Sequence, residues 1–265
     1  MPAIQLIKDD CLKAMRNIND GSIDMILCDL PYGKTNDGLK KKIWGNNRNN
    51  YWDKIIPLEP LWEQYKRVIK PNGAIALFAQ QPFAARLIMS NIKQFRYEWV
   101  WEKPMGTGFL NSNRMPLRKH ENILVFYKKL PVYNPQKTKG IPYTRSGEDK
   151  SSDNYNKFRG MPSVNKDGMR YPVDILRFPQ PICSGEKIYH PTQKPVELLK
   201  YLISTYTNEN ETVLDNCMGS GSTGVACIDL NRNFIGIELD GGYFQTAESR
   251  INAHLKKQKA ADTEI

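Results

Sequence analysis

Long hydrophobic runs are missing from this 265-residue sequence. No apolar segment approaches the ~18 consecutive residues that a membrane-spanning helix requires. The first residues, Met-Pro-Ala-Ile-Gln-Leu, also lack the basic flank and apolar stretch of a secretory signal. We therefore expect no membrane association and an intracellular location. The chain is long enough to bury one sizeable core.

Paired cysteines are missing as well. The five cysteines are odd in number, and no two of them form a Cys-x-x-Cys pair. This pattern argues against a disulfide framework and against a zinc module. We predict reduced thiols that fill packing space, and no metal site. The cysteines are Cys11, Cys28, Cys183, Cys217 and Cys227.

Acidic residues are in deficit, with 28 Asp+Glu against 38 Lys+Arg, a net charge of +10 and a pI near 9.3. Residues 128–177 hold eleven basic residues against five acidic ones. Aromatic side chains are interleaved with them, a mixture that suits phosphate contacts and stacking on bases. A solvated insertion is the alternative. The aromatic residues are Tyr133, Tyr143, Tyr155, Phe158 and Tyr171, and the basic ones are Lys128, Lys129, Lys137, Lys139, Arg145, Lys150, Lys157, Arg159, Lys166, Arg170 and Arg177.

Strand and helix patterns alternate along most of the chain, which predicts a parallel sheet covered on both faces. Residues 34–53 and 128–187 show no sustained period, and loops of that length are usually functional. The residues after Lys259 are expected to fray. Strands are predicted at 4–7, 23–28, 74–79, 97–101, 122–127, 212–215 and 234–238, and helices at 11–18, 58–70, 82–92, 195–207, 222–230 and 242–257.

A glycine-rich turn follows the predicted strand 212–215. Asp215 leads into Gly219-Ser220-Gly221-Ser222-Thr223-Gly224, and Glu238 ends the next strand. Glycines let the backbone approach a ligand closely, and the acidic residue is placed to accept hydrogen bonds from ribose hydroxyls. No Gly-Lys-Ser/Thr follows, which excludes a P-loop. The pattern predicts a site for a nucleoside cofactor.

The spacing of this turn also fits a nicotinamide dinucleotide. Asp215, however, lies inside the turn, where a carboxylate would repel a pyrophosphate. The same carboxylate would pair well with the α-ammonium group of a methionine moiety. This favours S-adenosylmethionine over a dinucleotide.

A second strand ends abruptly in Asp29-Leu30-Pro31-Tyr32. Open α/β sheets place their chemistry at such carboxyl ends. An aromatic amine is a poor nucleophile, and two acceptors on its N–H groups would offset the positive charge that develops during methylation. Asp29 offers a carboxylate and Leu30 a carbonyl, while Pro31 holds the backbone and Tyr32 can stack on a base lifted out of a helix. Taken alone, the loop is equally an ordinary proline turn.

Together the two loops resemble those of the DNA amino-methyltransferases, whose catalytic loop reads Asp/Asn/Ser-Pro-Pro-Tyr/Phe/Trp. The motif order resembles the beta group, with the catalytic loop first and the cofactor loop last, over residues 3 to 256. Leu30 stands where the family usually has Pro, and we expect its carbonyl to matter and its side chain to be dispensable. Further similar segments are Lys8-Asp9-Asp10-Cys11, Trp101-Glu102-Lys103-Pro104, Lys119-His120-Glu121-Asn122 and His190-Pro191-Thr192-Gln193-Lys194-Pro195.

The resemblance implies an α/β fold, the Rossmann-like fold of S-adenosylmethionine-dependent methyltransferases. The mostly parallel, seven-stranded sheet would be circularly permuted, with 213–215 and 234–238 as its first two strands, 4–7 as its third, and an antiparallel final strand. The catalytic half would span residues 1–127, a target-recognition region 128–187, the cofactor-binding half 188–259, and a tail 260–265.

The implied activity is site-specific transfer of a methyl group from S-adenosylmethionine to N6 of adenine in DNA after base flipping, as in restriction–modification. We expect duplex DNA as partner, with single strands as the alternative, no membrane, and the cytoplasm of a bacterial or phage-infected cell; a homodimer is left open. The catalytic residues would be Asp29, Leu30, Pro31 and Tyr32. The cofactor-binding residues would be Asp10, Cys11, His190, Thr192, Lys194, Asp215, Gly219, Gly221, Ser222, Thr223 and Glu238.

Three alternatives stay open at this stage. Methylation of N4 of cytosine uses the same amine chemistry, but an acidic first loop position favours adenine in this family. A nicotinamide-dependent oxidoreductase or a non-catalytic DNA-binding module would each leave one or both loops without a role.

His120 and His190 are candidate general bases, for which we expect structural or cofactor-lining roles instead. Lys40–Lys42, Trp44 and Arg48 would either fold over a flipped base or form a plain flexible loop.

Overall fold

The computed structural model describes residues 1–33, 53–147, 150–152, 155–158, 160 and 162–263. The loop residues Lys40–Lys42, Trp44 and Arg48 therefore lie outside the described residues. The chain divides into two compact units, one made of Met1–Asn134 with Asp174–Ile265 and one of Pro135–Val173. No helix in the described part of the chain is long and apolar enough to cross a membrane.

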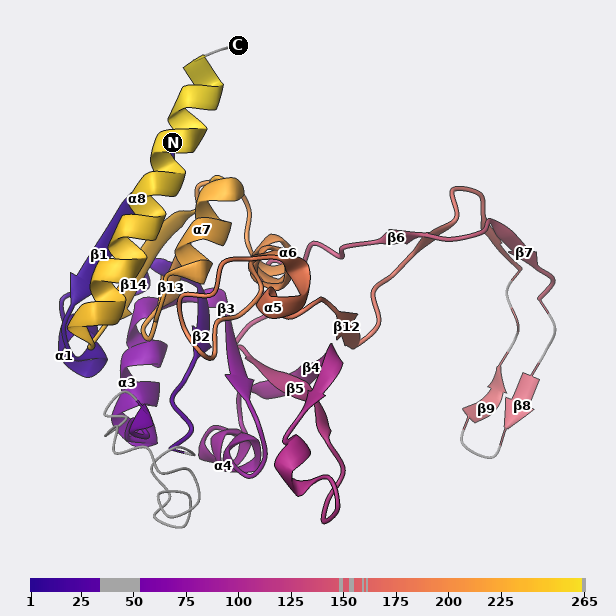
Figure 1. Cartoon of the computed structure of the whole chain (residues 1–265). Coiled ribbons are helices and arrows are strands. Elements are labelled where there is room, and N and C mark those ends of the chain that lie inside the picture. The colour runs from indigo at the N-terminus through magenta and orange to yellow at the C-terminus, as the bar shows by residue number, and fades with distance from the viewer. Residues whose placement is uncertain (34–52, 148–149, 153–154, 159, 161, 264–265) are drawn as a thin grey trace. The chain divides into compact units, whose positions relative to one another are not determined.

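An eight-stranded sheet forms the centre of the first unit, in the order β1-β14-β13-β2-β3-β5-β4-β12 (Figure 1). Only β5 runs against its neighbours. The expected permuted order is confirmed, because β14 and then β1 lie on one side of β13 while β2 lies on the other. The strands are β1 (Ile4–Lys8), β2 (Ile23–Asp29), β3 (Ile69–Ala79), β4 (Phe95–Thr107), β5 (Arg118–Phe126), β12 (Ile175–Arg177), β13 (Thr212–Asp215) and β14 (Asn233–Glu238).

Helices cover both faces of the sheet and make two buried cores. One core joins α6, α7 and α8 to side chains such as Leu27 and Phe234. The other joins α1, α3 and α4 to side chains such as Ile26 and Leu77. Ile26 and Leu27 thus point to opposite faces, as successive strand residues must, so the whole strand reads as one apolar run. The helices are α1 (Cys11–Met15), α3 (Leu58–Val68), α4 (Phe83–Ser90), α5 (Pro181–Ser184), α6 (Val196–Tyr206), α7 (Ser222–Asp229) and α8 (Gly241–Thr263).

Three elements differ from their prediction. An eighth strand, β12, pairs with β4 in a region for which the sequence shows no period. Pro71-Asn72-Gly73 lies inside β3 rather than before it, because a register shift opposite Ile23 and Met25 accommodates the irregular backbone. The last helix continues to Thr263, whereas the residues after Lys259 were expected to fray. Ala260 and Ala261 favour this extension because alanine is a strong helix former.

The second unit consists of short antiparallel strand pairs. Its pairs are β7 with β10, β6 with β11, and β8 with β9. The unit lies inside the predicted target-recognition region 128–187, whose role stays a prediction. The strands are β6 (Thr138–Lys139), β7 (Tyr143–Arg145), β8 (Lys150–Ser152), β9 (Tyr155–Phe158), β10 (Ser163–Asn165) and β11 (Met169–Arg170).

Candidate active site

The site forms where the order of the central sheet reverses. β13 and β2 are parallel neighbours, paired through Val213 with Met25 and Leu214 with Ile26. The chain continues from β13 to β14 on one side and from β2 to β3 on the other. Loops that leave two such strands in opposite directions open a crevice at their carboxyl ends, where α/β proteins bind ligands. Asp215 ends β13 and Asp29 ends β2, so both face this crevice.

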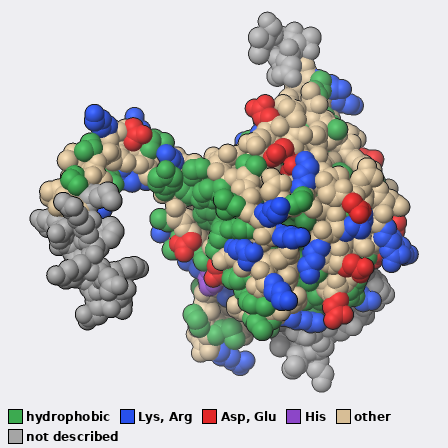
Figure 2. Space-filling view, turned by 180° about the vertical axis from the view of Figure 1, so that it is seen from behind, with side chains coloured by type: hydrophobic (Ala, Val, Ile, Leu, Met, Phe, Trp, Pro, Cys, Tyr) green, Lys and Arg blue, Asp and Glu red, His purple; other side chains and the backbone are tan. Residues whose placement is uncertain are grey.

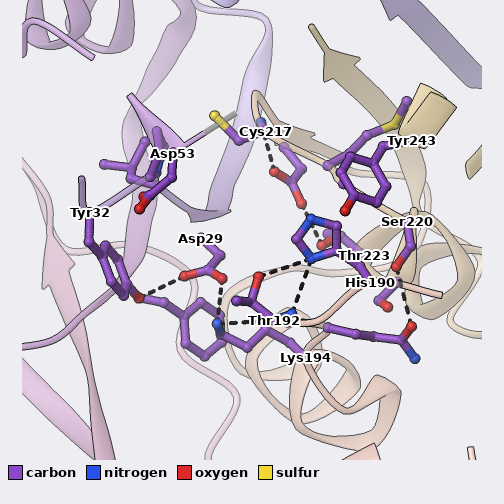
Figure 3. Close-up of a pocket in the computed structure, with 18 of the residues that line it drawn as sticks. Asp29, Tyr32, Asp53, His190, Thr192, Lys194, Cys217, Ser220, Thr223 and Tyr243 are labelled. Atoms are coloured by element: carbon purple, nitrogen blue, oxygen red, sulfur yellow. Dashed lines mark hydrogen bonds and ion pairs between the residues drawn. The ribbon is translucent and has the colours of Figure 1, made fainter. Parts of the chain in front are cut away.

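One cavity of about 680 Å³ joins the two loops. Its volume lies within the ~300–1,000 Å³ that is usual for ligand pockets. Figure 3 shows the side chains of both loops around it. Of the predicted site residues, only Gly221 is absent from its lining; those present are Asp10, Cys11, Asp29, Leu30, Pro31, Tyr32, His190, Thr192, Lys194, Asp215, Gly219, Ser222, Thr223 and Glu238.

Asp29 is held by hydrogen bonds on both of its carboxylate oxygens. The Tyr32 hydroxyl donates to Oδ1 at 2.7 Å, and the Lys194 ammonium donates to Oδ2 (Figure 3). The Tyr32 ring packs against Phe83, with 5.3 Å between the ring centroids. Burial raises the pKa of the Asp29 carboxyl, while the Lys194 charge and the Tyr32 hydroxyl act in the opposite direction. The carboxylate is therefore oriented before any substrate arrives.

The Leu30 side chain packs into the core beneath the loop. It is only 3% exposed and belongs to the core beneath α1, α3 and α4, together with Cys28 and Phe83. Its packing anchors the loop from below, and the expectation that only the Leu30 carbonyl takes part in the chemistry stays a prediction. A proline ring at this position would fill less of that core.

Lys194 belongs to the acceptor side of the cavity rather than to the cofactor side alone. Its buried ammonium pairs with Asp29 and lies 3.4 Å from Glu121 Oε2. Burial lowers the pKa of Lys194, but the two carboxylates outweigh this effect and raise it. Lys194 therefore carries its charge within the pair.

Glu121 and Lys103 extend this buried network, and neither was among the predicted site residues. Lys103 pairs with Glu121 Oε1, which also accepts a hydrogen bond from Gln80 Nε2 at 3.0 Å. Burial alone would raise the pKa of Glu121, but Lys194 and Lys103 hold it at about 2. Both residues lie in segments that resemble the family, so the sequence carried a signal for them. For Gln80 it carried none.

The glycine turn is shaped around Asp215. Its carboxylate accepts hydrogen bonds from the Cys217 backbone N–H at 3.1 Å and from the Thr223 hydroxyl at 2.6 Å. Burial raises the pKa of Asp215 to about 6, despite these donors. Gly221 has a φ of +76°, and a Cβ there would lie 2.9 Å from Ile251 Cδ1, so only glycine fits the turn. Gly221 thus supports the cavity without lining it.

Glu238 closes the other side of the turn. Its Oε2 accepts from the Gly219 backbone N–H at 2.9 Å, and its Oε1 accepts from Asp240 N at 2.8 Å. Burial raises the pKa of this carboxyl, and the two backbone donors oppose that rise. Each carboxylate oxygen has a second lone pair, so Glu238 keeps acceptor capacity for ligand hydroxyls.

His190 is a wall of the cavity and stays uncharged. Burial and the nearby Lys194 charge lower its pKa to about 4. Its Nδ1 accepts from Thr192 N at 3.2 Å, which places the ring proton on Nε2, and its ring centroid lies 4.2 Å from that of Tyr243. A neutral ring with one nitrogen engaged fits the predicted lining role. His120 is exposed on β5 and does not line the cavity.

Three cysteines that are scattered in sequence meet beside the cavity. The thiols of Cys11 and Cys28 each interact with that of Cys217. Burial raises the pKa of Cys28 to about 12, so it remains a thiol at neutral pH. Asp10 begins α1 by accepting from the backbone of Leu12 at 3.0 Å. Within the described residues, no group of three or more His, Cys, Asp or Glu is arranged to hold a metal ion.

Two further residues support the site: Asp53 lines the cavity, and Arg250 lies behind the glycine turn. Asp53 is buried and accepts a hydrogen bond from Gly33 N at 2.8 Å, which ties the chain after Tyr32 across 20 residues. Arg250 donates to Ser222 Oγ at 2.9 Å and to Ser220 O at 3.2 Å, which braces the glycine turn from α8. No local pattern in the sequence signals either contact.

The residues of the cavity fit S-adenosylmethionine. Asp215 is a buried carboxylate with oxygens already oriented, which suits an ammonium group, and Glu238 is a second buried acceptor for hydroxyls. The fold and the paired strand-end loops define a nucleoside-binding α/β enzyme. A family model described as DNA methylase (N6_N4_Mtase) matches residues 23–249, and the chain belongs to this family of DNA methylases.

Curated relatives and solved structures match almost the whole chain. The type II methyltransferase M.HpaI of Haemophilus parainfluenzae is 28% identical, over 95% of this chain and 75% of its own. M2.MboI of Moraxella bovis is 29% identical, over 93% and 87%. The structure of an M1.HpyAVI–SAM complex has a TM-score of 0.61 at 26% identity, over 94% and 99%. The cytosine-N4-specific PvuII DNA methyltransferase has a TM-score of 0.61 at 14% identity, over 97% and 94%, which shows a shared fold.

Proposed function

We propose that this DNA methyltransferase methylates N6 of adenine, with Asp29 and the Leu30 carbonyl accepting the N–H groups of the target amine. The observation that carries the proposal is that one continuous cavity joins the Asp29–Tyr32 loop to the Asp215–Thr223 loop. A methyl donor in one part and an aromatic amine in the other would be held in one enclosed space. Such placement by itself supplies a large part of the rate.

The cofactor is S-adenosylmethionine, which supplies a methyl group activated by a sulfonium when it is bound. We assign its α-ammonium to Asp215, its ribose hydroxyls to Glu238, and its adenine to Asp10. The backbone of Gly219 borders open space, since a Cβ built there would come no closer than 3.9 Å to His190. The turn therefore leaves room for the cofactor. The neutral ring of His190 adds no positive charge beside a cationic cofactor.

Asp29 performs two tasks in this proposal. Its oxygens are occupied by Tyr32 and Lys194, but each retains a lone pair for an amine N–H. Its carboxylate offsets the positive charge that develops on the nitrogen during transfer. Because burial raises its pKa, the same group is also a better acceptor for the proton that the amine then releases.

The choice of adenine over cytosine rests on the acidic first position of the loop. The fold does not discriminate between the two bases, since a cytosine-N4-specific enzyme shares it. An acidic residue at this position favours adenine in enzymes of this type, whereas serine favours cytosine. We take duplex DNA as the substrate, reached after base flipping, and the cytoplasm as the location. Membership of the DNA methylase family sets aside an oxidoreductase and a non-catalytic binding module.

The test is to incubate the protein with S-adenosylmethionine and unmethylated genomic DNA and to analyse the digested nucleosides by mass spectrometry. We expect N6-methyladenine, formed about 10²–10³ times more slowly by Asp29→Asn protein. Single-molecule sequencing of the same DNA would give the target sequence. N4-methylcytosine as the only product would overturn the assignment of the base. The absence of any methylated base, together with tight binding of NAD, would overturn the reaction.

A further inference from the structure

The connection between β4 and β5 is an ordered projection of the first unit. The two strands pair as far as Thr107 and Arg118, and residues 108–117 join them. Gly108 has a φ of +94°, which turns the chain into the short 3-10 helix at Phe109–Asn111. Backbone hydrogen bonds hold the tip, including Ser112 N to Phe109 O at 3.0 Å and Met115 N to Asn111 O at 3.0 Å.

This tip exposes large apolar side chains to solvent. Phe109 is 72% exposed and Leu110 is 57% exposed, although the turn that carries them is defined by hydrogen bonds. An ordered segment that places several large apolar groups in water typically marks a contact surface. The exposed apolar residues of the tip and its two stems are Met105, Phe109, Leu110, Met115 and Leu117.

The charged residues in the sequence of the tip and its stems are all basic, and two of them, Lys103 and Lys119, pair with Glu121 and Glu102. Residues 103–120 contain four Lys/Arg and no Asp or Glu. Arg114 and Arg118 are exposed, and they enter no ion pair with another described residue. The nearest acid along β4, Glu102, is already engaged by Lys119 at 3.1 Å and by Arg177 at 2.9 Å. A surface that combines arginines with apolar groups is complementary to the phosphates and base stack of DNA. In Figure 2 the tip between β4 and β5 forms the lobe at the lower end of the molecule, where hydrophobic side chains gather beside a basic one.

The same strand also borders the cavity. Lys103 and Thr107 of β4 line it together with Asp29 and Tyr32. The first tip residues therefore follow directly after residues that face the predicted base pocket. An enzyme that acts on a base inside a duplex must extrude that base, which breaks its pairing and leaves a gap in the stack.

We propose that the 108–117 tip docks on duplex DNA beside the target, where Phe109 and Leu110 enter the stack and Arg114 and Arg118 contact phosphates. The inference rests on the proposed base flipping. The apolar side chains would leave water and fill the space that the extruded adenine vacates, which offsets the lost stacking. The tip would thus assist extrusion and take no part in methyl transfer itself.

The test compares a Phe109→Ala/Leu110→Ala variant with the wild type on two duplexes. One carries the mapped target with normal pairing, and the other has an abasic site opposite the target adenine, which lowers the cost of extrusion. We expect kcat/KM to fall by on the order of tenfold or more on the normal duplex and to recover on the abasic duplex. The control is Met89→Ala, which removes a 71% exposed methionine of α4 that lies outside the cavity and outside residues 128–187, and it should leave both rates unchanged.

The phosphate contacts have their own measurement. Arg114→Gln/Arg118→Gln should weaken DNA binding and reduce the slope of log affinity against log salt by about two. Wild-type rates on both duplexes with the apolar variant, or an equal loss on both, would overturn the inference. So would a loss of dimers by the apolar variant in sedimentation, because the tip would then be a subunit contact. Formation of N6-methyladenine by the wild type separates these outcomes from failure of the proposed function.

Discussion

The Lys194 ammonium donates a hydrogen bond to the Asp29 carboxylate across 165 residues of sequence. Lys194 lies between two carboxylates, that of Asp29 in the Asp29–Tyr32 loop and that of Glu121, whose Oε2 is 3.4 Å from the ammonium. A cation in this position favours the ionised form of Asp29 and opposes the burial that raises the pKa of this carboxyl. It also fixes the direction in which Asp29 points.

Asp29→Asn should separate catalysis from cofactor binding. The amide keeps the shape of the side chain and loses the negative charge that offsets the developing cation. We expect kcat to fall by about 10²–10³, as for removal of other groups that stabilise charge in a transition state. Calorimetry should give an affinity for S-adenosylmethionine within about twofold of the wild type. Loss of both properties together would mean that Asp29 is structural.

Lys194→Met should move the pH dependence of kcat. The groups that face Asp29 are Tyr32, Lys194 and Glu121, with Cys28 and Asp215 nearby. Lys194 lowers the pKa of Asp29, so its removal raises that pKa. Activity needs the carboxylate form, so as the pH falls the variant should lose activity earlier, at a higher pH than the wild type does. The variant should therefore lose more activity at pH 6 than at pH 8.

Two matched variants complete that measurement. Lys194→Arg should return the pH profile towards that of the wild type, because it restores the charge. Lys200→Met removes a partly exposed lysine whose partners, Glu197 and Asp229, lie outside the cavity. Its profile should not move. If the three variants share one profile, Lys194 has no influence on the ionisation of Asp29.

Binding of S-adenosylmethionine should weaken in acid. Burial raises the pKa of Asp215 to about 6, so below that pH the carboxyl is protonated and no longer attracts an ammonium group. We expect the Kd to rise by nearly tenfold per pH unit below pH 6 and to stay level above pH 7. Asp215→Asn should bind weakly at every pH, with a flat profile. An unchanged slope in that variant would assign the titration to another group.

Leu30→Ala should destabilise the fold. The Leu30 side chain is buried with Cys28 and Phe83, and its truncation leaves a cavity. We expect the free energy of unfolding in urea to fall by about 2–5 kcal/mol. Leu110→Ala is the matched control, since that side chain is exposed and should change stability by less than about 0.5 kcal/mol. Equal effects of the two substitutions would contradict the packing of the loop.

The local sequence determined which segments carry the chemistry. A run such as Ile23–Cys28 is apolar at every position because both faces of the strand are covered, and it stops where Asp29 meets the crevice. The glycine spacing after Asp215 is equally local, since a φ of +76° at Gly221 excludes a side chain. Patterns of this kind can be recognised in the sequence because each residue type is required by its own backbone conformation or by its nearest neighbours.

Only the tertiary structure decided which of these groups share a space. Lys194, Glu121 and Lys103 come from three separate segments, and their ion pairs depend on how β4, β5 and the chain before α6 meet β2. The burial of Leu30 and the meeting of Cys11 with Cys217 are decided in the same way. Such contacts join residues far apart in sequence, so no local period or spacing encodes them. Burial at the place where these residues meet then shifts their pKa values.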